Sequence, residues 1–525
     1  MSDQESNLSD QAILYWSAVL GLDAGDDRFS AAVELIERYG QQSASLHEHT
    51  IDNGLAPIQT HRVPAPENSQ PSRFSFTDTA VRPLAASSAD LAFASLSDLA
   101  HWLQSGELSP VELAQMYLDR LDSHGGPLHC VVTRTADLAL QQARLAEKEI
   151  TAGEYRGPLH GIPWGAKDLL ATTGIPTTWG ATPFKDQVFD YDAAVVDRLS
   201  EAGAVLVAKL SMGSLAQGPH WFGGMTRNPW DTESGSSGSS AGPGAATAAG
   251  LVGFSIGTET HGSIVSPSHT CGVTGIRPTY GRVSRFGAMA LGYSLDKIGP
   301  MCRSAEDCAA VFAAIEGCDD RDPATVSAPF IWPMDVSSPR VGVIQAEYDA
   351  AEGAEADVDR AALEVLRSLG MDLVPVTLPP CPPGLMLTVW VESASAFDDL
   401  ARSGKLDSLK DEDNSNWPAI FRAARSVSAT DYLRAQRIRT QLILDVRELL
   451  GEYDAIICPG TGQESMTITN MTGHPALTLP AGFVDGKPRG MTLMGKFWDE
   501  STLLVIGHAF QSATSHHTAR PPLVS

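Results

Sequence analysis

Lys167 stands in a run of apolar and small residues, GIPWGAKDLL, at residues 161–170. Most lysines face solvent, so a lysine with these neighbours is either paired with Asp168 or buried as an amine. Burial lowers a lysine pKa from about 10.4 by up to several units. Because a neutral amine accepts protons, the sequence predicts that Lys167 serves as a general base.

A second candidate site is the glycine- and serine-rich segment SGSSGSSAGPG at residues 234–244. A flexible linker has a similar composition. The flanks are not typical of a linker, since Asn-Pro-Trp precedes the segment and an alanine-rich helix candidate follows at 245–249. A glycine-dense turn that enters a helix presents backbone N–H groups to an anion or an oxyanion. The segment has neither the Gly-Lys-Ser/Thr of a Walker loop nor the spacing of a dinucleotide loop.

A third candidate is the turn GTETHGS at residues 257–263, which follows a strand candidate at 250–257. Its consecutive N–H groups can point at one oxygen atom, with Ser263 at the end of the turn. An ordinary turn at a strand exit has the same spacing, so this turn by itself does not establish a catalytic role.

Taken together, the three segments resemble the amidase signature family of serine hydrolases, and the likeness covers roughly residues 91–520. In that family a GIPxxxKD run carries a lysine, a GGSSGG-type loop carries a bridging serine, and a TDTGGSI-type turn carries the nucleophile. Lys167 matches the first motif and Ser263 the third. Ser239 is the better bridging serine than Ser236, because GSSAGPGAATAAG then matches the family sequence without a gap.

The resemblance implies hydrolysis of a carboxylic amide by a Ser–cis-Ser–Lys triad that uses no cofactor and no metal ion. Lys167 would accept a proton from Ser239, which would accept one from Ser263. Ser263 would then attack the carbonyl carbon and form an acyl-enzyme, which water cleaves by the reverse relay. The resemblance also implies a cis peptide between Gly238 and Ser239, and we expect Ser240 to support Lys167 or the oxyanion turn.

The backbone of the turn would supply the donors that hold the oxyanion. These are the N–H groups of Thr260, His261, Gly262 and Ser263. The side chains expected to contact a small-molecule or peptide amide substrate are Trp221, Phe222, His261, Trp390 and Glu392.

Three positions around the nucleophile depart from the family pattern. Glu259 replaces the usual aspartate, His261 replaces one of two glycines, and Val265 replaces a common arginine. The first and third changes resemble the peptide-amidase-like branch of the family. His261 is either structural or faces the substrate, and no substrate is inferred from the missing arginine.

Two other nucleophiles remain open. Residues 238–242 also fit the Gly-x-Ser-x-Gly elbow of α/β-hydrolases, which would make Ser240 the nucleophile of a Ser-His-Asp esterase. That elbow needs a strand immediately before it, whereas NPWDTESGS is polar and turn-like. Cys271 is the nearest candidate for a cysteine nucleophile, although buried structural cysteines are far commoner.

Two other functions fit the same motifs. A glutaminase of the amidotransferase A-chain type would supply ammonia to a tRNA-modifying partner within a complex of several chains. A non-catalytic binding relative is the other alternative. The intact Lys167, Ser239 and Ser263 argue against that second alternative.

Strand and helix candidates alternate from about residue 91 onwards. Short apolar runs typical of buried strands lie at 204–210, 250–257, 341–345 and 454–460. Helical patterns lie at 95–122, 191–203, 304–317 and 358–370. We therefore expect an α/β fold with three layers, α/β/α, in which helices flank a mixed central sheet.

The chain divides at about residue 90. Residues 1–90 form an N-terminal extension, with helical apolar spacing up to about residue 48 and a Pro-, Ser- and Thr-rich linker or strap at 52–90. Residues 91–525 form the catalytic domain, in which the polar segment 400–435 is a lid or an insertion.

Composition excludes several classes of protein. The 525 residues are 43% hydrophobic and 19% charged, which rules out wholesale disorder. The net charge of −26 disfavours direct binding to nucleic acid. The 7 cysteines include no Cys-x-x-Cys pair, so neither a disulfide framework nor a zinc site is indicated. Because no signal pattern or membrane span is seen, we expect a cytoplasmic protein, and a homodimer is compatible with the sequence.

Overall fold

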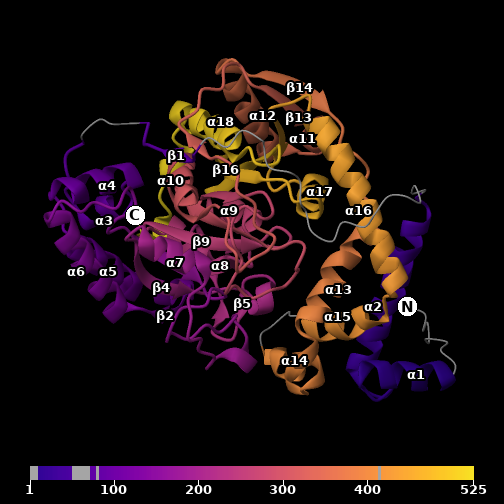
Figure 1. Ribbon diagram of the computed structural model, residues 1–525. Helices are drawn as coiled ribbons and strands as arrows, with labels where there is room; N and C mark the ends of the chain where they lie inside the picture. The colour runs from indigo at the N-terminus through magenta and orange to yellow at the C-terminus, as the bar shows by residue number, and fades with distance from the viewer. Residues whose placement is uncertain (1–9, 50–70, 78–81, 412–415, 525) are drawn as a thin grey trace.

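One mixed sheet of 11 strands runs through the molecule (Figure 1). The computed structural model describes residues 10–49, 71–77, 82–411 and 416–524. Across the sheet the strands are β14 (Asp372–Val376), β13 (Arg340–Ile344), β15 (Ala455–Pro459), β17 (Lys487–Gly495), β16 (Ala476–Val484), β10 (Thr274–Arg277), β11 (Lys297–Cys302), β9 (Phe254–Glu259), β3 (Pro163–Lys167), β4 (Val205–Leu210) and β2 (Val131–Arg134). β3 lies near one end of this order and runs parallel to both of its neighbours, β4 and β9.

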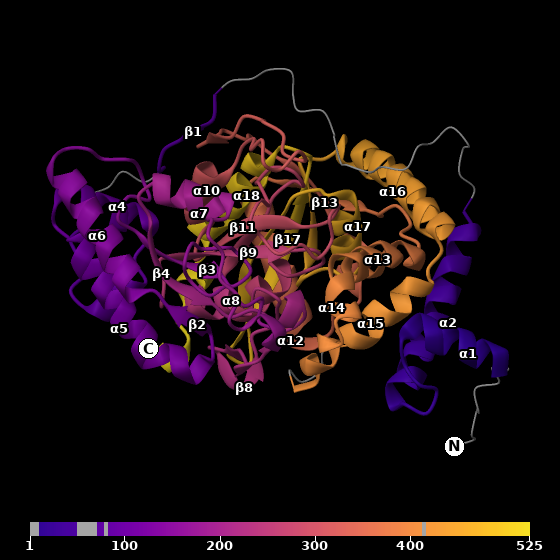
Figure 2. The same cartoon turned by 60° about the horizontal axis from the view of Figure 1, so that its bottom comes forward.

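Helices cover both faces of the sheet, as Figure 2 shows for α10 and α18 on one side and α8 on the other. The helices of the sheet region are α3 (Ser88–Ala92), α4 (Leu96–Ser105), α5 (Pro110–Leu128), α6 (Ala136–Thr151), α7 (Ala194–Glu201), α8 (Ala241–Ala248), α9 (Val265–Cys271), α10 (Ala305–Ile315), α11 (Gln345–Asp349), α12 (Gly353–Ser368), α17 (Glu464–Thr472) and α18 (Glu500–Ala513). The predicted three-layer α/β/α fold with a mixed sheet is therefore confirmed.

The strand predictions at 204–210, 341–345 and 454–460 are confirmed by β4, β13 and β15. The prediction at 250–257 begins too early, because β9 starts only at Phe254. The preceding residues close the turn after α8, where the Leu251 N–H bonds the Ala246 carbonyl at 2.9 Å. Periodicity did not distinguish this apolar turn from a strand.

The helices predicted within 95–122 are α4 and α5, and the capping signal between them is also observed. The Ser109 side chain accepts hydrogen bonds from the N–H groups of Val111 and Glu112, at 3.0 and 3.3 Å, while Pro110 opens α5. This cap satisfies donors that the first turn of a helix leaves unpaired.

The N-terminal extension contains the expected helices, α1 (Asp10–Leu20) and α2 (Asp27–His47). Much of the predicted linker at 52–90 lies outside the described residues. In its described part, β1 (Arg73–Phe74) pairs in parallel with β12 (Ile331–Trp332). Tyr39 and Leu46 of α2 belong to the main hydrophobic core.

The segment 400–435 is largely helical, as expected. It lies within a group formed by α13 (Leu387–Ala396), α14 (Asp398–Arg402), α15 (Trp417–Ala423) and α16 (Ala429–Leu450). These helices stand beside the sheet at one end of the molecule, and α2 packs against α13, α15 and α16 (Figures 1 and 2).

The cap of α5 gives a stability prediction. Ser109→Ala should lower the free energy of unfolding by about 1–2 kcal/mol, because two N–H groups lose their acceptor. Thermal unfolding of the variant measures this change. Ser123→Ala is the control, since the exposed Ser123 hydroxyl only donates to the Asp119 carbonyl within the same helix. Equal melting temperatures for the two variants would contradict the prediction.

Candidate active site

Lys167 ends β3 and is fully buried. Its Nζ lies 2.8 Å from Ser239 Oγ, 3.0 Å from Ser240 Oγ, 2.8 Å from Thr258 Oγ1 and 3.3 Å from the Thr258 carbonyl oxygen. All four contacts are neutral oxygen atoms. The amine is therefore held by polar groups but paired with no carboxylate.

Burial lowers the pKa of Lys167 to about 7, although the carboxylates of Asp296 and Glu259 act in the opposite direction. The adjacent Asp168 does not compensate this burial, because it turns to the other side and pairs with Lys209 at 3.2 Å. Of the two states expected for Lys167, the structure therefore shows the buried amine.

The loop that carries Ser239 packs tightly against the chain at Gly218. The peptide between Gly238 and Ser239 is cis. A Cβ atom at residue 238 would lie 2.0 Å from the Gly218 carbonyl oxygen, so only glycine fits there. Ser239 is 1% exposed, and its carbonyl accepts a hydrogen bond from the Gly213 N–H at 3.2 Å. Ser236 does not contact Lys167, because its hydroxyl donates to the Ser237 carbonyl instead.

Ser240 joins this loop to the end of β9. Its hydroxyl donates to the Thr258 carbonyl at 3.1 Å and accepts from the Thr258 N–H at 3.1 Å. The Ser240 N–H also donates to the Ser263 carbonyl at 3.2 Å. Ser240 thus positions the lysine, the bridging serine and the nucleophile turn relative to one another.

A buried carboxylate anchors the nucleophile turn. Glu259 Oε2 accepts the N–H groups of Ile264 and Val265 at 2.8 and 2.9 Å, while Oε1 accepts from Arg277 at 2.5 Å and from Asn470 at 2.8 Å. Burial would raise the pKa of Glu259, but the charges of Arg277 and Lys297 lower it to about 2. The carboxylate is therefore ionised throughout the physiological range and holds both ends of the turn.

Ser263 is the most accessible of the three candidate catalytic residues, at 7% exposed. No hydrogen bond joins its hydroxyl to Ser239 in the described part of the chain, so the second link of the expected relay is not formed. The two segments are nevertheless adjacent, through the Ser240–Ser263 backbone contact at 3.2 Å. Catalytic hydrogen bonds often tighten only when a substrate binds.

The turn leaves a row of backbone donors without acceptors. Over the described residues, the N–H groups of His261, Gly262 and Ser263 make no hydrogen bond to protein. Gly262 has φ +87°, a conformation that favours glycine, and a Cβ atom there would lie 2.8 Å from Met466 Sδ. Three consecutive free donors beside a serine hydroxyl match the requirements of an oxyanion site.

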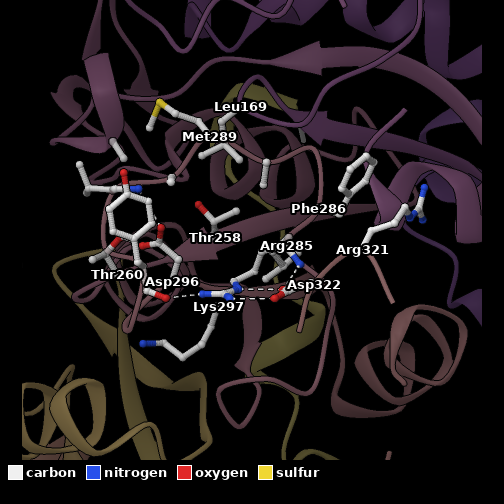
Figure 3. A pocket seen from close by; sticks show the side chains of 16 residues that line it. Leu169, Thr258, Thr260, Arg285, Phe286, Met289, Asp296, Lys297, Arg321 and Asp322 are labelled. Carbon is white, nitrogen blue, oxygen red and sulfur yellow. Dashed lines mark hydrogen bonds and ion pairs between the residues drawn. The ribbon is translucent and has the colours of Figure 1, made fainter. Parts of the chain in front are cut away.

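A cavity of about 230 Å³ opens at the end of β9 and the start of the turn (Figure 3). Thr258 and Thr260 belong to its wall, and the Thr260 hydroxyl donates to Asp296 at 2.6 Å. Leu169 and Met289 lie on one side and the Arg285–Asp322 ion pair on another. Much of the remaining wall is apolar and includes Phe286, Ala288, Ala290, Leu291 and Ile298.

The amidase family profile matches residues 112–504. The chain belongs to the amidase signature family. The A subunit of the glutamyl-tRNA(Gln) amidotransferase from Chloroflexus aggregans is 36% identical over 474 residues, which cover 80% of this chain and 96% of the relative. The protein is therefore an amidohydrolase, an enzyme that cleaves amide bonds.

Solved structures of this family share its fold. The native peptide amidase from Stenotrophomonas maltophilia has a TM-score of 0.71 and 30% identity, covering 82% of this amidase and 98% of that chain. An amidase family protein from Bacillus anthracis has a TM-score of 0.75 and 26% identity. The match covers 83% of this amidase and 94% of that chain.

His261 packs partly buried against α17. Its Nε2 lies 3.1 Å from Thr467 Oγ1, and burial lowers the pKa of its imidazole. The cavity wall does not include this side chain. Among the described contacts, the ring of His261 thus joins the nucleophile turn of the amidase to a neighbouring helix.

The four other side chains expected to contact substrate lie elsewhere. Trp221 is buried and donates to the His129 carbonyl at 3.2 Å, and Phe222 stacks edge-on against Trp221. Neither lines the cavity, because β5 (His220–Trp221) turns back toward His129. Trp390 packs on Trp417, and Glu392 accepts hydrogen bonds from Ser294 behind the cavity wall. The apolar character that suggested a pocket for the aromatic residues instead reflects packing.

The alternative nucleophiles do not have the surroundings that they require. Ser240 is fully buried and bonds Thr258 and Lys167, and no histidine of the described residues contacts it. A Ser-His-Asp esterase site at Ser240 is therefore wrong. Cys271 is also buried, and burial raises the pKa of its thiol well above the usual range. It is not a thiolate nucleophile.

The sequence interpretation did not anticipate the apolar lining of the cavity or the Arg285–Asp322 pair in its wall. Most of this wall comes from residues 285–298, which follow the GVTGIRPTYGRVS run, whereas Asp322 lies further along the chain. No motif marks these residues, and only their place beside β9 makes them part of the site.

Among the described residues, no helix is both long enough and apolar enough to cross a membrane.

The lowered pKa of Lys167 predicts the pH dependence of the amidase. Below about pH 7 the amine is protonated and has no lone pair for Ser239, so kcat/KM should fall about tenfold per pH unit. Above that pH it should reach a plateau. Initial rates with an uncharged amide substrate measure the profile.

Asp296→Asn provides the control for this assignment. Asp296 raises the pKa of Lys167, so its removal should move the midpoint to lower pH. A profile that is flat across neutral pH, or a midpoint that does not move in the variant, would be incompatible with Lys167 as the titrating base.

Proposed function

We propose that the amidase hydrolyses linear carboxylic amides through a triad of Lys167, Ser239 and Ser263. The observation that carries the proposal is the buried Lys167 amine, 2.8 Å from Ser239 and with its pKa lowered to about 7. Such an amine is a base at neutral pH, which is the property that a serine nucleophile needs from its neighbour.

In the proposed reaction, Lys167 takes the Ser239 proton while Ser239 takes the Ser263 proton. The Ser263 oxygen bonds to the carbonyl carbon, and the carbonyl oxygen becomes an oxyanion. The N–H groups of Thr260, His261, Gly262 and Ser263 stabilise this charge. The Lys167 ammonium returns the proton through Ser239 to the leaving nitrogen, and the C–N bond breaks.

Water completes the cycle. It attacks the acyl-enzyme as its proton passes through Ser239 to Lys167, and the same proton then returns to Ser263 as the carboxylic acid leaves. Each step moves a proton between the reacting atom and Lys167 by way of Ser239. The reaction therefore consumes one amide and one water and forms one acid and one amine.

The cavity favours an uncharged acyl group. Its cations are already engaged, since Arg285 pairs with Asp322 and Arg321 with Asp319 and Asp197. The remaining cation, Lys297, is buried, donates to the Leu295 carbonyl and turns away from the other labelled side chains in Figure 3. Apolar acyl groups gain about 25 cal/mol per Å² that they bury against such a wall.

A second candidate function is that of the glutaminase component in an amidotransferase complex. The identity to the amidotransferase chain of Chloroflexus aggregans supports it. Glutamine carries an α-carboxylate that needs a cation. The two arginines of the cavity wall are already paired with carboxylates, and Lys297 is buried and donates to the Leu295 carbonyl. Hydrolysis of apolar acyl amides by a chain that works outside an amidotransferase complex is therefore preferred. Size-exclusion chromatography combined with a glutaminase assay distinguishes an amidase for apolar acyl amides from the glutaminase component of a complex.

We also propose the wider setting of the amidase. Residues 91–525 form the catalytic domain and residues 1–90 an extension of it. The enzyme acts in the cytoplasm on small-molecule or peptide amides, without binding nucleic acid or a membrane. A homodimer is compatible with this function, and the same size-exclusion experiment reports it.

Substitution of the triad tests the reaction. Lys167→Ala, Ser239→Ala and Ser263→Ala should each lower kcat/KM by about 10⁴-fold or more, because members of a proton relay act as a unit. A serine-directed fluorophosphonate should label the wild-type enzyme at Ser263, as peptide mapping by mass spectrometry would show. Labelling at Ser240 alone, or full activity of Lys167→Ala, would falsify the assignment.

The acyl preference has a test of its own. Phe286→Ala should lower kcat/KM for phenylacetamide by about tenfold, because apolar contacts in the cavity are lost, and leave acetamide hydrolysis within about twofold. Phe222→Ala is the matched control, an exposed aromatic residue that does not line the cavity. If both variants behave alike, the cavity does not receive the acyl group.

A further inference from the structure

The wall loop, residues 290–296, is fixed from behind by two helices outside the sheet. Glu392 of α13 accepts the Ser294 N–H at 2.9 Å and its hydroxyl at 2.5 Å. Arg439 of α16 donates to the Ser294 hydroxyl at 2.6 Å and to its carbonyl at 2.7 Å. Every polar atom of Ser294 is therefore bound by this pair.

Ser294 lies within the part of the loop that shapes the cavity. Leu291, Tyr293 and Asp296 of the wall loop line the cavity. Asp296 closes the loop by accepting the N–H groups of Leu291 and Gly292 at 2.8 and 3.0 Å. A shift of Ser294 would therefore displace the wall, and through Asp296 it would reach Thr260 of the nucleophile turn.

Glu392 and Arg439 are buried, and other α16 residues hold them in place. The Tyr432 hydroxyl donates to Glu392 at 3.0 Å, and the Gln436 side chain lies 3.2 Å from Arg439. Side chains on one face of α16 therefore hold the wall loop in place. The position of this helix decides where Ser294 sits.

The N-terminal extension fixes α16 on an adjacent face. Arg434 donates to the carbonyls of Leu46 and His49, at 2.9 and 2.8 Å, and His47 lies 3.1 Å from Asp431. Leu46 is fully buried and packs closely on Gly384. A Cβ atom at residue 384 would lie 2.6 Å from the Leu46 side chain. Figures 1 and 2 both show α2 alongside α16, far from the sheet.

We propose that α2 of the N-terminal extension is a positioning element of the substrate cavity, acting through α16, Arg439 and Glu392 on Ser294. None of these residues touches the reacting atoms. They set the wall against which the acyl group binds, so their loss weakens binding of bulky acyl groups more than it slows the chemical step. This inference rests on the proposed amidase function.

Full-length Glu392→Gln and Arg434→Met variants test the proposal, with phenylacetamide and acetamide as substrates. Glu392→Gln should raise KM for phenylacetamide by about tenfold, and Arg434→Met should raise it by about threefold, with kcat for acetamide within about twofold in both. Hydrogen exchange of peptides that span the wall loop should quicken in both variants. Arg360→Met is the matched control, since its exposed pair with Asp357 lies on α12, and it should change nothing.

The double variant decides whether the two residues act along one route. If both act on Ser294, the combined effect on KM should be smaller than the product of the single effects, whereas independent sites multiply. Multiplying effects, or an Arg434→Met enzyme that melts earlier with unchanged KM and exchange, would overturn the proposal. Acetamide hydrolysis by the wild type and its loss in Ser263→Ala report separately on the amidase function.

Discussion

The site depends on a lysine amine that is buried without an ionic partner among the residues that the structure describes. Lys167 has four oxygen neighbours and no carboxylate among them, because Asp168 next to it pairs with Lys209. A carboxylate in contact would stabilise the ammonium and raise its pKa, which would remove the base. At the end of β3 the side chains of Lys167 and Asp168 thus have different partners, which leaves the amine available as the base of the proposed relay.

The nucleophile turn is held by an ionised group for a related reason. Glu259 occupies the aspartate position of the family pattern and reaches Ile264, Val265, Arg277 and Asn470. With this anchor, the N–H groups of His261, Gly262 and Ser263 have no protein acceptor in the described part of the chain. An oxyanion site needs donors that are fixed before the reaction, so the buried carboxylate and the free donors form a single arrangement.

The substrate cavity is assembled from parts of the chain that are distant in sequence. Its wall loop is supported by Glu392 and Arg439, and α16 in turn carries the N-terminal helix α2. On the proposed function, an amidase built on a common sheet would vary its acyl preference through peripheral helices while the triad stays unchanged. This separation of chemistry from selectivity matches the general observation that loops and additions, rather than the fold, define substrates.

The sequence by itself determined the family, the α/β fold, and the segments that carry Lys167, Ser239 and Ser263, because these depend on local motifs and periodicity. It also predicted the cap at Ser109 and the helices of the extension. It did not determine that Trp221 bonds His129, that Phe222 packs on Trp221, that Glu392 lies behind the cavity, or that residues 285–298 line it. Those facts depend on which side of a strand or helix meets which neighbour, and apolar or charged character alone does not distinguish packing from binding. Only the tertiary structure decided them, because long-range contacts choose among local patterns that are equally compatible with the chain.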